Sequence, residues 1–173
     1  MEDEIHSSLK FNILNPGDLK LFFLEHLNHI YWAKAHLVER LPEIEEIAFF
    51  KDLKQAIIET KEDVERQMVR IDEIFTLLDS KSSAENCDGI IAMVEGAFSS
   101  IQLRADNSIL RDLSILFYMQ NIESIEISSF QILQIAAVKM KNIQITQLLK
   151  ENYDEAKRDR TLLLLIASKY ITS

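Results

Sequence analysis

Apolar residues recur at alternating intervals of four and three along most of the chain, which predicts long helices that each bury one face. The first helix is expected to begin after an N-cap at Asp18 and to end at Leu41. A short helical continuation bent against it is expected after Pro42. Four further helices are predicted by the same spacing, over residues 51–79, 84–104, 108–140 and 143–171.

The low content of turn-forming residues favours the same fold class. Only three glycines and two prolines occur in 173 residues, whereas a β-rich fold needs many turns. We therefore expect an all-α protein, an antiparallel four-helix bundle with an additional shorter helix over residues 84–104. Residues 1–15 carry no sustained period and are expected to form a flexible arm before a single bundle domain, residues 16–173.

Charge and composition exclude several classes of partner. The net charge is −9 and the lysines and arginines are scattered, which argues against nucleic-acid binding. No apolar run approaches the length of a membrane span, so no membrane partner is expected. The acidic start is unlike a signal peptide, and the single cysteine fits a reducing compartment, so we expect a cytoplasmic protein.

Polar residues interrupt the apolar seam near the middle of each long helix. They are Lys34, Thr60, Gln67, Glu123, Glu126, Asn152 and Asp159. If the helices are in register, these interruptions meet at one level of the core. A ring of polar side chains halfway along a four-helix bundle is where ferritin-like proteins hold a di-iron site.

A second interpretation of the two glutamates remains open at the level of sequence. A seam shifted along the same helix, through Ile115, Ile122, Ile125 and Phe117, is also apolar. With the helix rotated to bury that seam, Glu123 and Glu126 would face solvent.

Several stretches of the sequence occur in a recognisable succession. They read LFFLEHLNHIYWAKAHLVERLPEIEEIA, LKQAIIETKEDVERQMVRIDEIFTLL, NCDG, QNIESIEISSF and LLKENYDEAK. Together with Tyr31, Ala33 and Cys87, they resemble the ferritin-like YciE/YciF family, which is linked to bacterial stress responses. The resemblance covers nearly everything after residue 18, and it implies a ferritin-like bundle with a di-iron site.

The chain departs from this family at the positions that would hold metal. Lys34 stands where the resemblance implies a carboxylate ligand, and Thr60 and Gln67 stand where it implies histidines. Ala156 replaces one glutamate of a pair, and the motif around Glu123 keeps its acids but lacks the family's histidine.

Three seam carboxylates remain, Glu123, Glu126 and Asp159, whereas a di-iron site takes about six ligands. We therefore expect no bound metal and a vestigial site. Two buried acids need a compensating charge, so Lys34 is expected to contact at least one of the two glutamates.

Three functions follow as hypotheses. The first is a non-catalytic, ferritin-like stress or structural protein without a cofactor. It is expected to be a homodimer that buries the apolar run Leu162–Ile166 or the aromatic start of the first helix. The second is a protein that still holds iron or manganese through the remaining carboxylates and a histidine. The third is a helical protein-interaction module. No small-molecule substrate is identifiable.

His26 and His29 form a weaker signal. Their spacing of three residues can bind zinc. They lie beside the apolar seam rather than in it, and no further ligand is near in sequence, which favours a surface or interface role.

Overall fold

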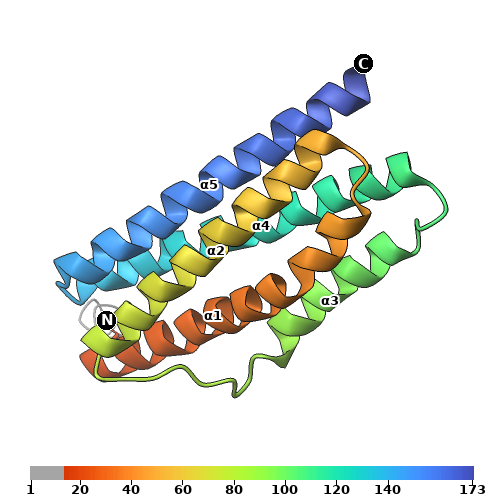
Figure 1. The fold of residues 1–173 in the computed structure, drawn as a ribbon. Coiled ribbons are helices and arrows are strands. Elements are labelled where there is room, and N and C mark those ends of the chain that lie inside the picture. The colour runs from red at the N-terminus through yellow and green to blue at the C-terminus, as the bar shows by residue number, and fades with distance from the viewer. Residues whose placement is uncertain (1–13) are drawn as a thin grey trace, which may run out of the picture.

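The computed structural model describes residues 14–173, which form five helices (Figure 1). These are α1 (Pro16–Ile47), α2 (Lys51–Leu77), α3 (Asp88–Gln102), α4 (Ser108–Lys139) and α5 (Ile143–Thr172). The long helices form an antiparallel bundle in which α1 and α5 each pack against both α2 and α4 (Figure 1). The shorter α3 packs against α1 and α4, so the predicted fold class is confirmed. Nearly all of the expected flexible arm, residues 1–15, falls outside the described residues.

An asparagine precedes and caps three of the helices. The side-chain oxygens of Asn15, Asn107 and Asn142 accept backbone N–H groups three residues further on, at 2.9–3.0 Å. Pro16 occupies the first position of α1, where a missing N–H leaves no bond unmade. The predicted cap at Asp18 is therefore wrong, because Asp18 lies inside the first turn.

α1 continues through Pro42 without a break, so the predicted end at Leu41 is wrong. The expected helical continuation is part of the same helix. Leu41 and Ile44 are both buried in the core on either side of the proline. Their packing offsets the hydrogen bond that Pro42 cannot make.

The start of α3 lies later than the sequence spacing predicts. A start at Ala84 was expected, but the helix begins at Asp88. Asn86 has a φ of 61°, a left-handed conformation that a continuous α-helix cannot include. The connection from α2 is therefore longer than expected, and it runs along the outside of the bundle beside α1 (Figure 1).

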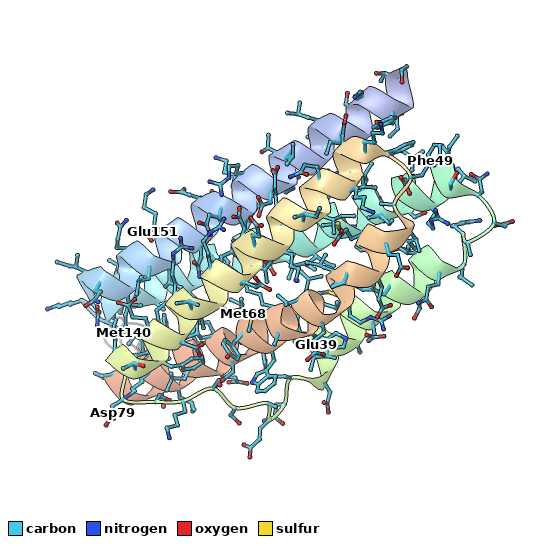
Figure 2. All side chains as sticks on the ribbon, viewed as in Figure 1. Glu39, Phe49, Met68, Asp79, Met140 and Glu151 are labelled. Atoms are coloured by element: carbon cyan, nitrogen blue, oxygen red, sulfur yellow. The ribbon has the colours of Figure 1, made fainter. Side chains whose placement is uncertain are left out.

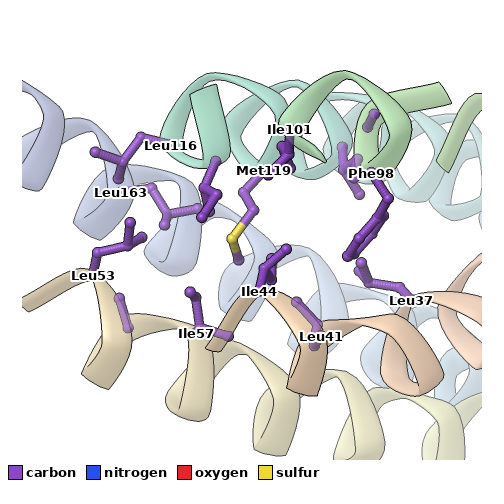
Figure 3. Packing of buried hydrophobic residues seen from close by; sticks show 14 of the residues in the cluster. Leu37, Leu41, Ile44, Leu53, Ile57, Phe98, Ile101, Leu116, Met119 and Leu163 are labelled. Carbon is purple, nitrogen blue, oxygen red and sulfur yellow. The ribbon is translucent and has the colours of Figure 1, made fainter. Parts of the chain in front are cut away.

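The apolar core consists of two clusters, one in each half of the bundle. Figure 2 shows the two ends of the molecule, with Phe49 at one and Asp79 and Met140 at the other. The upper cluster lies toward Phe49 and contains residues of all five helices, among them Leu37, Leu41, Ile57, Phe98, Leu116, Met119 and Leu163 (Figure 3).

The lower cluster lies toward Met140. It contains residues of α1, α2, α4 and α5, among them Phe23, Leu27, Ile71, Phe130 and Leu149. The buried residues of α3 all belong to the upper cluster, so α3 covers only one half of the bundle. No helix within residues 14–173 has the length and apolar character to cross a bilayer.

Candidate functional site

Buried polar side chains from all four long helices separate the two clusters. On α1, Lys34 lies between Ile30 of the lower cluster and Leu37 of the upper cluster. We call this set the polar layer. Its members are each at most 5% exposed, and they are Lys34, Asp63, Gln67, Glu123, Glu126, Asn152 and Asp159. Thr60 is also buried, but it lies between Ile57 and Val64, which both belong to the upper cluster. The predicted interruptions of the seam other than Thr60 thus do meet inside the bundle.

The alternative in which α4 is rotated is wrong. Glu123 and Glu126 are 2% and 4% exposed, whereas Phe117 is 60% exposed. Ala156, at another of the positions singled out from the sequence, is completely buried on α5.

Lys34 is the cation of the polar layer. Its side chain is fully buried, and its Nζ forms an ion pair with Glu126 Oε2 and donates a hydrogen bond to Gln67 Oε1. The same ammonium lies 5.4 Å from the centre of the Phe130 ring, within the range of a cation–π contact. The expected contact between Lys34 and one of the two glutamates is confirmed.

The carboxylates near Lys34 outnumber it. Among the described residues, Glu123 Oε2, Glu126 Oε1 and Asp159 Oδ2 are buried without a hydrogen-bond partner. Burial and the adjacent Glu126 raise the pKa of Glu123 well above its ordinary value, although Lys34 opposes this. Burial likewise raises the pKa of Asp159 to about 6, against the opposing charges of Arg158 and Lys34. The raised pKa of Glu123 favours its protonated form, which reduces the negative charge of the layer, and Asp159 gains its proton only as the pH falls through about 6.

The side of the layer between α2 and α5 is held by arginines. Arg70 binds Glu155 with two hydrogen bonds of 2.7 and 2.9 Å and also donates to Asn152 Oδ1 at 3.1 Å. Burial alone would raise the pKa of Glu155, but Arg70 reverses the effect and lowers it. Arg158 donates to Asp63 Oδ2 at 2.6 Å. This side is thus charge-paired, in contrast to the carboxylates around Lys34.

The raised pKa of Asp159 predicts a pH dependence of stability. Its folded-state pKa, about 6, lies above the ordinary value of 3.8, so the folded state binds the proton more tightly. Stability from this group therefore rises as the pH falls through 6 and is lost as the pH rises. Asp159→Asn should be more stable than the wild type by about 1–3 kcal/mol at pH 7.5, and this difference should shrink toward pH 5. Urea unfolding across this range measures it.

Asp154→Asn is the matched control, because Asp154 is an exposed aspartate on the same helix. That substitution should leave the difference from the wild type independent of pH. A pH-independent difference for Asp159→Asn as well would contradict a raised pKa of Asp159 in the folded protein.

Two buried acids were missed by the sequence analysis, Asp63 and Asp112. Asp112 is fully buried on α4, outside the polar layer, and its Oδ2 accepts the backbone N–H groups of Phe49 and Phe50 at 2.8 and 2.6 Å. It thereby caps α2, whose own N-cap, Phe50, has no side-chain acceptor. The seam spacing does predict burial of Asp112, because steps of four, three and four back from Glu123 lead through Met119 and Leu116 to Asp112.

The residues present do not fit the di-iron site that the resemblance implies. No histidine of residues 14–173 belongs to the polar layer, and an ammonium already engages one oxygen of Glu126. Within the described part of the chain, no three His, Cys, Asp or Glu side chains are arranged to hold a metal ion. The ligand chemistry of an iron pair, four glutamates and two histidines, is absent from this layer.

A comparison with models of protein families shows to which family this chain belongs. A family model described as "Domain of unknown function (DUF892)" matches residues 18–173. The chain belongs to the DUF892 family. The resemblance read from the sequence is thereby confirmed, whereas the fate of the metal site is not addressed by the match.

Two solved structures have the same fold as this DUF892 protein. YcfI from Rhodopseudomonas palustris, which has been proposed to be a structural protein, is 26% identical, with a TM-score of 0.79 over 89% of this chain and 96% of that chain. The stress protein YciF of E. coli is 22% identical, with a TM-score of 0.83 over 90% of this chain and 98% of that chain. A search of curated protein sequences gives no match.

Proposed function

We propose that this DUF892 protein is a non-catalytic, stress-related bundle protein in which a Lys–Glu core has replaced a di-iron site. The observation that carries the proposal is the fully buried Lys34 ammonium bound to Glu126 and Gln67. The descriptions of YcfI as structural and of YciF as a stress protein support a role of this kind.

The electrostatics of the layer support a replacement rather than a simple loss. Buried carboxylates need a positive charge, protons or water, and in a di-iron protein the metal supplies that charge. Here Lys34 supplies it on the side of Glu126, and the raised pKa of Glu123 supports a proton as a second source of compensation. A metal ion would have to displace both the ammonium and this proton.

The alternative, a protein that holds iron or manganese, is supported by one observation. Unpaired oxygens of Glu123, Glu126 and Asp159 lie in the same layer, and oxygen ligands suit both metals. Metal content separates the two functions.

Protein purified without chelators should contain well under one equivalent of iron, manganese or zinc, because the layer lacks imidazole ligands and contains an ammonium. Elemental analysis by inductively coupled plasma mass spectrometry measures this directly. Near-stoichiometric metal that is lost in Glu123→Ala and retained in the control Glu62→Ala, an exposed position of α2, would establish the metal-binding alternative instead.

Two further properties belong to the proposal, a cytoplasmic location and a homodimer. The apolar run of α5 supports an interface, because Leu164 and Leu165 are 51% and 64% exposed. The aromatic start of α1 supports it less, because Phe23 is fully buried in the lower cluster. An interaction module for another helical partner would use the same exposed apolar face of α5.

A further inference from the structure

A cavity of about 330 Å³ lies between α1, α3 and α4, at the level of the polar layer. Its apolar walls include Phe22 and Ile30 of α1, Met93 of α3, and Ile125 and Leu133 of α4. The cavity lies where the cover provided by α3 begins, since the buried residues of α3 all pack into the upper cluster. It leads from the surface of the bundle to the ion pair, because Glu126 is one of its lining residues.

Two polar side chains in this apolar lining have unmet hydrogen-bonding capacity. Glu126 is 4% exposed, and while Lys34 engages its Oε2, its Oε1 is buried without a partner among the described residues. His29 Nε2 is buried without a partner in the same part of the chain. His26 also lines the cavity, with its ring centre 5.6 Å from that of His29. Buried polar atoms are rarely left unpaired, so unpaired atoms on two residues that line one cavity point to a ligand.

We propose that this cavity binds a small amphipathic molecule, an apolar chain that ends in a hydroxyl or a protonated amine. The apolar chain would lie against the Phe22, Met93 and Ile125 walls, and the O–H or N–H would donate to Glu126 Oε1. A ligand that ends in a carboxylate lacks the donor that this oxygen needs and is repelled by the acid. His29 Nε2 provides a second polar contact for the head group.

The size and composition of the cavity fit a small molecule. Small-molecule sites span roughly 300–1,000 Å³, with mostly apolar walls and a few placed polar groups. A chain of about eight carbons with one head group is of suitable size for the lower end of that range, and ligands this small bind with dissociation constants of the order of 10–1,000 µM. Because Glu126 Oε1 must be free of metal, the proposal rests on the proposed function in this respect, and elemental analysis tests that function separately from the binding of a small molecule.

The test uses the full chain and three probes of equal chain length, 1-octanol, octylammonium and octanoate, measured by isothermal titration calorimetry. At least one of the two donor-headed probes should bind with a stoichiometry of one, and octanoate should bind at least tenfold more weakly. No binding by either donor-headed probe would overturn the proposal, and so would equal binding of octanoate.

A matched pair of serines on α4 locates the site. Ser129 lines the cavity and Ser128 does not, although each donates its hydroxyl to the backbone carbonyl four residues earlier. Ser129→Phe should fill the cavity and weaken binding at least tenfold, whereas Ser128→Phe should change it less than twofold. Thermal unfolding followed by circular dichroism shows that both variants are folded. If Ser129→Phe fails to fold, Met93→Trp fills the cavity from α3 and should give the same loss.

A second copy of the chain is the competing occupant of this cavity. Light scattering distinguishes it, because the proposal expects Ser129→Phe and Ser128→Phe to have the oligomeric state of the wild type. A dimer that only Ser129→Phe dissociates would show that the cavity is an interface between copies and would overturn the proposal. Equal binding of the probes to both serine variants would overturn it as well.

Discussion

Lys34→Met should lower the free energy of unfolding by about 3–5 kcal/mol at neutral pH. The substitution removes the cation that pairs with Glu126 and leaves Gln67 Oε1 without its donor. Two acids then remain buried beside one another without that ammonium, which is the configuration that makes breaking a buried ion pair expensive. Denaturant unfolding at neutral pH provides the measurement.

Removing the whole charged group should reverse most of that loss. In Lys34→Met with Glu123→Leu and Glu126→Leu, the polar layer loses its cation and two of its acids together, and an apolar replacement of a buried charge cluster is often neutral or stabilising. Lys150→Met is the control, since Lys150 pairs with Asp154 on the surface and should matter little. Losses that simply add across the three buried positions would contradict an energetic coupling between Lys34 and the glutamates.

Asp112→Ala should lower the free energy of unfolding by about 2–4 kcal/mol, the second largest effect expected. It leaves the backbone N–H groups of Phe49 and Phe50 without their acceptor at the junction of α1 and α2. Arg111 donates to the carbonyl of Ile47 at the same junction, so α4 contacts both helix ends there. Chemical denaturation of the variant measures the loss.

Two control variants test whether the loss comes from the missing hydrogen-bond acceptor. Asp112→Asn keeps an oxygen acceptor and should lose less than half as much. Asn107→Ala removes the N-cap of the same helix and should lose only about 1 kcal/mol. An Asp112→Ala variant no less stable than Asn107→Ala would show that water replaces the carboxylate at this junction.

The heptad spacing predicts which residues are buried in the polar layer, because the buried face of a helix depends only on the spacing of residues along that helix. Steps of three and four from Phe130 reach Glu126 and Glu123, and the same counting on α1 reaches Lys34. All three are buried as expected. The same spacing reaches Asp112, which the sequence analysis did not single out.

Other features depend on information that periodicity does not contain. The start of α3 is fixed by the left-handed backbone of Asn86, and the continuity of α1 by packing on both sides of Pro42. The cavity depends on where α3 begins to cover the pair α1 and α4, which is a property of three helices together. The partners of Glu155 and Asp63 are arginines outside the seam, so a reading confined to seam positions could not find them.

The division of the core by the polar layer has a consequence for how the helices align. Sliding α1 or α4 by a heptad past its neighbours would preserve apolar contacts at most positions, because the seams repeat with that period. Such a slide, about 10 Å along the axis, would separate Lys34 from Glu126 and would break the buried ion pair of the observed alignment. The same buried charges that reduce the stability of the bundle thus favour one alignment of its helices over alignments that are shifted by a heptad.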